Sequence, residues 1–317
     1  MSADPAATGA DPRLRGLDYE IVLVAYRSAG LVRALLDALP GRPVAVVDNS
    51  HDVDGLAAVV AGRPGVRYLD GPGRGFASGA NLGVRTSTHD IVVFVNPDSS
   101  PDVATLDALA ADIAADPGLG AVSATTVLPD GRVEIGVGGW EPTARRALVH
   151  AVGAHKVFPT AGLWARPVPG KPIELDWLSG ACMAVRRATF DELGGFDEQF
   201  FVYNEDVAFG RAIREAGLRQ RVRTDLLVPH LGGGSGEGKT HMLRLRGASL
   251  VRYVRQHHPA STVLGVRLAL TVGYGPRYLL ARMRGQAGQA AEHAAYIAGL
   301  WIGAPDHSSV RTSTQPQ

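Results

Sequence analysis

The chain of 317 residues has one cysteine and almost no net charge. Cys182 cannot form an intramolecular disulfide, and no second thiol is present to complete a CxxC metal or redox pair. A reducing, cytosolic compartment fits this composition best. Thirty-two lysines and arginines against 31 aspartates and glutamates leave a net charge of +1, which excludes a protein that acts through overall positive charge. Any charged partner must therefore be bound by a local group of residues.

Long apolar runs are also missing. The residues before Tyr19 contain no apolar core, so they do not resemble a signal peptide, and we expect a disordered tail over residues 1–18. The most apolar stretch, Val263 to Leu280, is interrupted by charged residues, glycine and proline and falls short of the roughly 18 apolar residues of a spanning helix. With 45% hydrophobic and 20% charged residues, the chain has the composition of a folded protein of one or two domains.

Short β-branched runs alternate with helical patterns through the first 124 residues. Strands are predicted over 19–26, 43–48, 66–69, 91–95 and 119–124, and helices over 31–39, 53–61, 76–86 and 106–115. This alternation predicts an α/β domain with a mostly parallel, doubly wound sheet and helices on both faces. Residues 136–171 are rich in Gly, Pro and Arg and predict a long irregular loop. A strand over 178–185 and a helix over 204–216 follow.

Polar or aromatic residues follow four predicted strands at their carboxyl ends: Tyr26, then Asp48 and Asn49, then the glycine loop ending at Gly75, then Asn96 and Asp98. In an open parallel sheet these ends meet at one edge, where ligands bind. These residues predict a nucleotide-diphosphate site. They supply an aromatic ring to cover a base, a carboxylate to bind base or ribose, a glycine loop to bind a diphosphate and a carboxylate to bind a cation. Taken singly, the same residues are also ordinary turn and cap residues.

The glycine loop does not match the dinucleotide fingerprint GxGxxG. It follows the third strand instead of the first, and Phe76 stands where the third glycine belongs. Hydride transfer with a dinucleotide cofactor is therefore disfavoured.

Six ordered motifs lie between Tyr19 and Ser235: residues 46–50, 75–83, 96–98, 177–187, 194–198 and 200–206. With them the chain resembles the inverting family 2 glycosyltransferases of the GT-A fold, and within that family the rhamnosyltransferases that act on lipid-linked sugars. The resemblance implies a Rossmann-like GT-A domain over residues 19–237.

The resemblance also implies roles for individual residues. Asp206, with Glu205 beside it, corresponds to the catalytic base, and Asp98 and His230 correspond to ligands of a divalent metal, Mg²⁺ or Mn²⁺. The residues expected at the donor nucleotide are Ala25, Tyr26, Asp48, Asn49, Gly75, Phe76, Asn81 and Asn96, and those expected at the acceptor are Trp177, Ser179 and Gly180. The chemistry agrees, because glycosyl transfer needs a base for the acceptor hydroxyl and a cation for the leaving diphosphate.

Two features keep alternatives open. Asn96 replaces the first carboxylate of the DxD-like element, so a cation would be held mostly through the nucleotide diphosphate. Two acids in the first turn of a helix, such as Glu205 and Asp206, also favour the helix dipole without any catalysis.

The C-terminal region has a different composition. From Gly238 to Ala291 there is no Asp or Glu, whereas Lys239 and eight arginines lie there, interleaved with leucines and valines. We expect a basic amphipathic helical region over 238–303 that associates with an anionic membrane surface, then a disordered tail over 304–317. Helix faces that are merely solvated are the alternative. Nucleic acid is not expected as a partner, because no stacking platform or known module is present.

The expected protein is a cytoplasmic enzyme, peripheral on the inner face of the cell membrane. By resemblance, it transfers L-rhamnose from dTDP-rhamnose to a polyprenyl-diphosphate-linked N-acetylglucosamine. The open alternatives are another donor (UDP-galactofuranose, a UDP-hexose or GDP-mannose) and a nucleotide-sugar-binding module without activity. A sugar nucleotidyltransferase is disfavoured, because its glycine loop follows the first strand, where this chain has Ala25 to Ser28.

Overall fold

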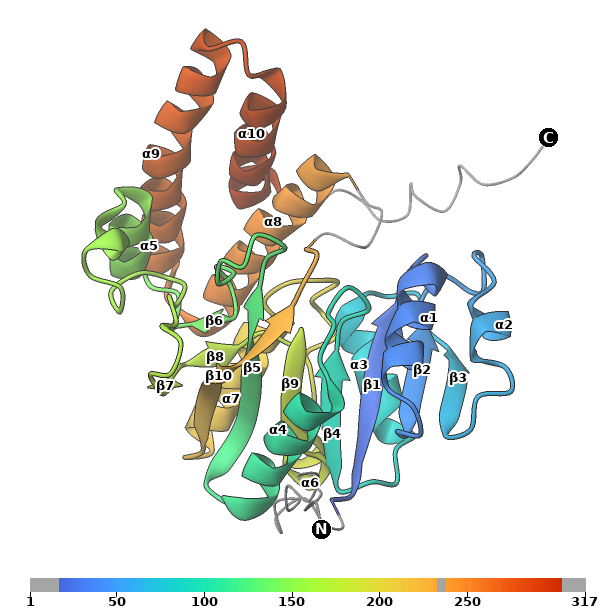
Figure 1. Cartoon of the computed structure of the whole chain (residues 1–317). Helices are drawn as coiled ribbons and strands as arrows, with labels where there is room; N and C mark the ends of the chain where they lie inside the picture. Colours follow the sequence, from blue (N-terminus) through green and yellow to red (C-terminus); the bar gives the residue numbers. More distant parts are fainter. Residues whose placement is uncertain (1–16, 233–237, 304–317) are drawn as a thin grey trace, which may run out of the picture.

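An eight-stranded sheet forms the centre of the molecule (Figure 1). The computed structural model describes residues 17–232 and 238–303. The sheet order is β3-β2-β1-β4-β9-β5-β10-β7, in which β9 and β7 run antiparallel to the other strands. The strands are β1 (Tyr19–Ala25), β2 (Val44–Asp48), β3 (Val66–Asp70), β4 (Ile91–Val95), β5 (Leu119–Val127), β7 (Ile173–Glu174), β9 (Cys182–Arg186) and β10 (Arg219–Pro229). The predicted mostly parallel α/β sheet is confirmed.

Helices cover both faces of this sheet. They are α1 (Ala29–Ala38), α2 (Leu56–Val60), α3 (Phe76–Arg85), α4 (Val103–Ala115), α6 (Arg187–Glu192) and α7 (Glu205–Glu215). Ile21 and Leu23 of β1 pack in one core with α1, α2 and α4, and Val22 packs in the other core with α3, α6 and α7. Because both faces are buried, the strands are continuous apolar runs, which is why the sequence located them.

The segment between β5 and β9 is more regular than predicted. It contains α5 (Ala144–Ala151), a 3₁₀ turn (Ala154–Lys156), and a small sheet of β6 (Gly138–Gly139) with β8 (Trp177–Leu178). The expectation of an irregular loop over 136–171 was therefore wrong in part. Thr143 caps α5 by accepting a hydrogen bond from Arg146 N, and Ala147 and Ala151 are buried, so tertiary packing stabilises a helix that composition did not reveal. The strand predicted over 178–185 is divided by a turn, in which Ser179 Oγ accepts from Ala181 N.

Three C-terminal helices lie beyond the carboxyl end of the sheet (Figure 1). They are α8 (Lys239–His257), α9 (Ala260–Met283) and α10 (Ala287–Ile302), so the expected helical character of this region is confirmed. The helices α8 and α10 pack closely through Gly247 and Gly299: a Cβ on Gly299 would lie 2.1 Å from the carbonyl oxygen of Arg244. Within the described part of the chain, no helix is both long and apolar enough to cross a bilayer. The tails expected at the two ends lie outside the described residues, apart from Leu17 and Asp18.

Glu141 connects the sheet domain to the C-terminal helices. Its carboxylate accepts hydrogen bonds from the Tyr253 hydroxyl of α8 at 2.8 and 2.9 Å and from His258 Nε2 at 2.7 Å. On the side of α7 it pairs with Arg211 at 3.2 Å and with Arg214. Burial opposes ionisation, but these hydrogen bonds outweigh it and lower the pKa of Glu141. One carboxylate thus joins α7 to α8, and we call these five residues the Glu141 cluster.

We expect Glu141→Gln to lower the free energy of unfolding by about 2–4 kcal/mol, because two arginines and a buried hydroxyl lose an ionised partner. The folded-state pKa lies below the unfolded value, so this stabilisation is complete above the unfolded pKa and is lost as the pH falls through the folded value. Denaturant unfolding at several pH values measures both effects.

Glu215→Gln is the matched control. Glu215 also pairs with Arg211, at 2.7 Å, but its side chain is 62% exposed. Such a pair contributes less than about 1 kcal/mol. Equal decreases in the free energy of unfolding of the two variants would contradict the proposed contribution of Glu141 to stability.

Candidate active site

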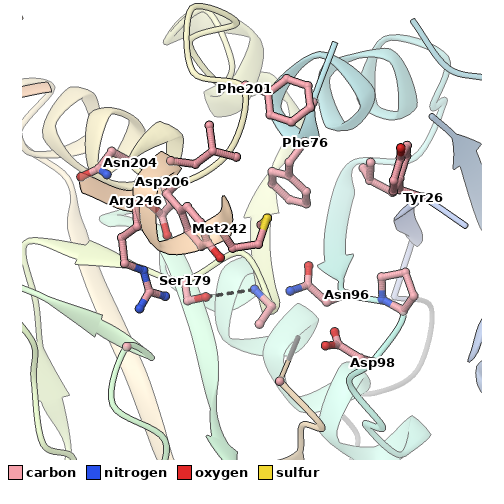
Figure 2. Close-up of a pocket in the computed structure, with 18 of the residues that line it drawn as sticks. Tyr26, Phe76, Asn96, Asp98, Ser179, Phe201, Asn204, Asp206, Met242 and Arg246 are labelled. Atoms are coloured by element: carbon pink, nitrogen blue, oxygen red, sulfur yellow. Dashed lines mark hydrogen bonds between the residues drawn. The ribbon is translucent and has the colours of Figure 1, made fainter. Parts of the chain in front are cut away.

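A pocket of ≈ 1010 Å³ lies at the carboxyl edge of the sheet, beneath α8 and α10. The loops after β1, β2, β3 and β4 form one side, and residues of the β5–β9 segment, α7, α8 and α10 form the other. Figure 2 shows that Tyr26, Asn96 and Asp98 lie across the pocket from Asp206 and Arg246. The strand-end residues and the C-terminal helices therefore share one site.

Ten of the predicted site residues line this pocket: Tyr26, Asn49, Gly75, Phe76, Asn96, Asp98, Trp177, Ser179, Asp206 and His230. Five others do not: Ala25, Asp48, Asn81, Gly180 and Glu205. Among these five, Ala25 accepts a hydrogen bond from Asn49 N through its carbonyl oxygen, and Gly180 lies against the Phe76 ring. Both support pocket residues from behind.

Asp48 is fully buried and stands behind the pocket wall. Its carboxylate accepts hydrogen bonds from Ser50 N at 2.8 Å, Ser50 Oγ at 2.6 Å, Asp52 N at 2.7 Å and the Tyr68 hydroxyl at 3.0 Å. Burial opposes ionisation, but the hydrogen bonds from Ser50, Asp52 and Tyr68 lower the pKa of Asp48 overall. Asp48 thus holds the turn that presents Asn49, and its expected contact with base or ribose stays a prediction.

Asn81 is also a structural residue. Its amide donates to the carbonyl oxygen of Phe196 at 2.8 Å and accepts from Phe196 N at 3.0 Å, which fixes α3 to the turn after α6. Its amide nitrogen also donates to Glu198 Oε1 at 3.0 Å, and the side chain does not line the pocket.

The glycine loop before α3 is held by both sides of the pocket. The amide of Asn49 donates to the Gly75 carbonyl oxygen at 2.8 Å, and Phe76 N donates to the Phe201 carbonyl oxygen at 2.9 Å. Gly75 has φ +97°, and a Cβ there would lie 1.8 Å from the Phe201 oxygen. Only glycine fits this position, so the loop places Phe76 in the pocket wall.

Asp98 lies in a chain of charged groups with His230 and Glu134. His230 Nδ1 is 2.7 Å from Glu134 Oε2, and its Nε2 is 3.2 Å from Asp98 Oδ1. Burial disfavours the charged ring, but the two carboxylates raise the pKa of His230 to about 10. In this structure carboxylate oxygens engage both ring nitrogens, so neither nitrogen faces the pocket with a free lone pair.

The fit to a divalent cation therefore depends on oxygen ligands. Among the described residues there is no group of three or more His, Cys, Asp or Glu side chains that could hold a metal ion. Asp98 and the amide of Asn96 line the pocket together and supply the oxygen atoms that Mg²⁺ and Mn²⁺ prefer (Figure 2). They fit a cation that takes its remaining ligands from a bound diphosphate and water.

Asp206 lies in the first turn of α7, opposite Asp98. Tyr203 and Asn204, just before it, both have φ +67°, a left-handed conformation that turns the chain sharply into the helix. Burial raises the pKa of Asp206 to about 6, while the hydrogen bond from Val207 N and the charge of Arg246 act in the other direction. At neutral pH, the group is a carboxylate with appreciable proton affinity.

Glu205 has a different environment. It is buried behind Asp206, and burial together with the neighbouring Asp206 charge raises its pKa well above the ordinary value. Glu205 thus lies outside the pocket, and only the second residue of the predicted pair lines the cavity.

Arg246 of α8 was not predicted as a site residue. Its guanidinium lies 4.7 Å from the centre of the Tyr203 ring, and Figure 2 shows it and Met242 beside Asp206 and Ser179. His241 and Leu245 of the same helix also line the pocket. The sequence placed these residues in a membrane-associating region because only their composition was visible.

One signal near α8 could have drawn attention to this edge. Residues 233–240, Gly-Gly-Ser-Gly-Glu-Gly-Lys-Thr, match the pattern of a phosphate-binding loop. Residues 233–237 lie outside the described part of the chain. In that motif the lysine binds phosphate, whereas here Lys239 is exposed and pairs with Glu292 of α10 at 2.9 Å. The match therefore assigns no function.

Comparison with known proteins decides the family. The model of glycosyl transferase family 2 matches residues 20–194, more than half of the chain. The chain belongs to glycosyltransferase family 2. It is a glycosyltransferase, and the predicted family and enzyme class are confirmed.

Two curated relatives illustrate the similarity. An N-acetylglucosaminyl-diphospho-decaprenol L-rhamnosyltransferase of Mycobacterium tuberculosis is 29% identical over 261 residues, which cover 73% of this chain and 77% of that protein. The low-salt glycan biosynthesis hexosyltransferase Agl10 of Haloferax volcanii is 26% identical over 208 residues, 62% of each chain.

Solved structures support the fold. The mannosyltransferase PcManGT from Pyrobaculum calidifontis, in complex with GDP-Man and Mn²⁺, has a TM-score of 0.57 at 21% identity and covers 90% of this chain and 87% of that one. GalNAc-T7 with UDP, GalNAc and Mn²⁺ has a TM-score of 0.55 at 15% identity and covers 76% of this chain and 48% of that one. The predicted GT-A fold is confirmed.

We expect Arg246→Gln to raise the pKa of Asp206 further, by up to about one unit, because the variant lacks the positive charge that favours the carboxylate. NMR titration of the carboxyl carbon measures this directly, with the signal assigned by comparison with Asp206→Asn. Arg252→Gln is the control, since Arg252 is exposed elsewhere on α8 and does not line the pocket. An unchanged titration in Arg246→Gln would show that the two charges do not interact.

Proposed function

We propose that this enzyme transfers L-rhamnose from dTDP-rhamnose, with inversion, to a polyprenyl-diphosphate-linked N-acetylglucosamine. The observation that carries the proposal is the similarity to a rhamnosyltransferase with this type of acceptor over 73% of the chain. The pocket is lined both by polar strand-end residues and by residues of an apolar cluster. We also propose a cytoplasmic, peripheral location, because a lipid-linked acceptor lies at a membrane surface.

The polar end suits the donor. Tyr26 offers a ring to the base, Asn49 offers an amide, and the glycine loop lines the pocket with Gly73 and Gly75, where its backbone would meet a diphosphate. Asp98 and Asn96 would hold a divalent cation there, which stabilises the negative charge of the leaving diphosphate when it is bound. His230 positions Asp98 through its hydrogen bond to Oδ1.

The apolar end suits a lipid-linked acceptor. Its walls are Pro142, Leu163, Trp164, Leu250 and Tyr296, contributed by the β5–β9 segment, α8 and α10. At the boundary between the two ends, Arg246 offers a positive charge to the acceptor diphosphate.

Asp206 stands where the two ends meet and acts as the base. It takes the proton from the acceptor hydroxyl as that oxygen forms a bond to the anomeric carbon, while the bond from this carbon to the diphosphate oxygen breaks. A single displacement opposite the leaving group inverts the configuration. A pKa of about 6 keeps Asp206 ionised at neutral pH and still basic enough to accept a proton.

We expect Asp206→Asn to reduce turnover by at least about 10²-fold while nucleotide binding is retained, because the amide cannot accept the proton. Glu205→Gln is the matched control: Glu205 lies outside the pocket, and burial and the Asp206 charge raise its pKa well above the ordinary value, so the isosteric neutral amide should keep most of the activity. Steady-state kinetics and calorimetric binding of dTDP separate the two effects. Loss of turnover in Glu205→Gln alone would exchange the roles of the two acids.

The donor is tested by competition. We expect dTDP-rhamnose to be preferred by about 10²-fold or more over UDP-galactofuranose, UDP-glucose and GDP-mannose on a short-chain lipid-diphosphate acceptor, because a site shaped for a 6-deoxy sugar leaves the extra hydroxyl of a hexose unpaired. The assay is run with Mg²⁺, with Mn²⁺ and with a chelator. If another nucleotide sugar is preferred, the proposed donor is wrong but the proposed type of reaction is retained. If nucleotide sugars bind but no sugar is transferred, the protein is a non-catalytic binding module.

A further inference from the structure

Two segments of the chain contain no acidic residue, and the fold brings them together. Residues 142–173 and residues 238–291 lack Asp and Glu. In the structure, α5 of the first segment packs along α9 of the second (Figure 1). A Cβ on Gly265 would lie 2.7 Å from Ala144 Cβ, and one on Gly273 would lie 2.8 Å from Ala151, so the two helices are parallel and in close contact.

One side of α9 carries a stripe of exposed apolar residues. Leu264, Leu268, Val272, Leu279 and Met283 recur at intervals of three to four residues or of seven, which places them on one side of a helix. Each is at least half exposed, up to 81% for Met283. The opposite side of α9 is buried against α8 and α10. The helix therefore has apolar residues on two sides, of which only one is covered.

The stripe continues onto α5. Leu148 and Val152 are exposed, and they lie next to the residues that contact α9. Because the two helices are parallel, the helical repeat of 100° per residue directs Leu148 and Val152 to the same side as the stripe. Just after α5, Val157 and Phe158 are 73% and 62% exposed. We call the surface formed by Leu148, Val152, Leu264, Leu268, Val272 and Met283 the α5–α9 face.

Positive charge and an aromatic residue border this face. Arg145 lies on the same side of α5 as Leu148 and Val152, and Arg282 lies on the same side of α9 as the apolar stripe. Both arginines are exposed. At the other edge, the indole of Trp301 donates to Thr271 Oγ1 at 2.9 Å and is 42% exposed, with Arg267 stacked on it at 5.4 Å. Apolar residues flanked by arginine and tryptophan, with no acid in either segment, are the pattern of a protein surface that enters a lipid headgroup layer.

We propose that the α5–α9 face docks on an anionic lipid bilayer. This narrows the membrane-associating region expected over residues 238–303, since Arg246 of that region lines the pocket and Arg244 bonds to the Gly303 carbonyl oxygen. The segment that follows α5 also reaches the pocket: Leu163 and Trp164, between α5 and β7, line its apolar end. The purpose of docking, delivery of a lipid-linked acceptor, rests on the proposed function, whereas the docking itself does not.

The test is co-sedimentation of the full chain with vesicles that contain no acceptor, either phosphatidylcholine alone or phosphatidylcholine with phosphatidylglycerol. We expect binding to the anionic vesicles that weakens with salt. Leu268→Glu should reduce it at least about tenfold, because an apolar contact is replaced by a like charge. Val53→Glu is the matched control, since Val53 is 68% exposed, lies beside α2 far from this face, and should bind as the unmodified chain does.

Removal of the bordering charges is the second arm. Arg145→Gln with Arg282→Gln should remove most of the preference for anionic over neutral vesicles. Thermal unfolding and transfer to a short-chain, water-soluble acceptor confirm that each variant is folded, because none of these residues lines the pocket.

The outcomes are distinct. Absence of binding to either vesicle, or equal binding by Leu268→Glu and the unmodified chain, overturns the proposal. A concentration-dependent dimer that Leu268→Glu abolishes, without vesicle binding, also overturns it and assigns the face to a second copy. If the protein binds vesicles but does not transfer rhamnose, the docking proposal is supported and only the proposed donor is wrong.

Discussion

The site depends on the hydrogen bonds and ion pairs that the carboxylate of Glu141 makes. This carboxylate is held by arginines of α7 on one side and by Tyr253 and His258 of the α8 end on the other, so it fixes the C-terminal helices relative to the first turn of α7. That first turn carries Asp206, and α8 carries Arg246. The distance between the acidic and the basic group in the pocket is therefore set by a cluster that itself lies outside the pocket.

The pocket also depends on opposed electrostatic effects. Burial and the pairing of two acids at Glu205 and Asp206 would keep both protonated, but Asp206 alone has the N-terminal amide of Val207 and the positive charge of Arg246 nearby. The environment therefore raises the pKa of Glu205 well above its ordinary value and holds that of Asp206 at about 6, although the two acids are adjacent in sequence. On the opposite wall, Glu134 and Asp98 hold His230 as a cation in the same way.

Much of the fold could be predicted, because the strands of the central sheet are buried on both faces and therefore are continuous apolar runs. Most strand-end residues were also correctly assigned to the pocket, since the carboxyl ends of parallel strands meet at one edge. Asp48 shows what the sequence could not give: a carboxylate after a strand can face a ligand or support its own turn, and only the structure shows the hydrogen bonds from Ser50, Asp52 and Tyr68 that support the turn. Arg246 was not recognised, because a helix remote in sequence carries no local sign of the cavity it covers. The α5–α9 contact was invisible for the same reason.

The most direct test of the account is a crystal structure of the Asp206→Asn variant with dTDP-rhamnose and Mg²⁺, in which the donor survives because the base is absent. The account predicts the diphosphate beside Asp98, the base against Tyr26 and Asn49, and the face of the anomeric carbon opposite the diphosphate open toward residue 206 and Arg246. A diphosphate bound away from Asp98, or an anomeric carbon screened from residue 206 by the protein, would contradict it.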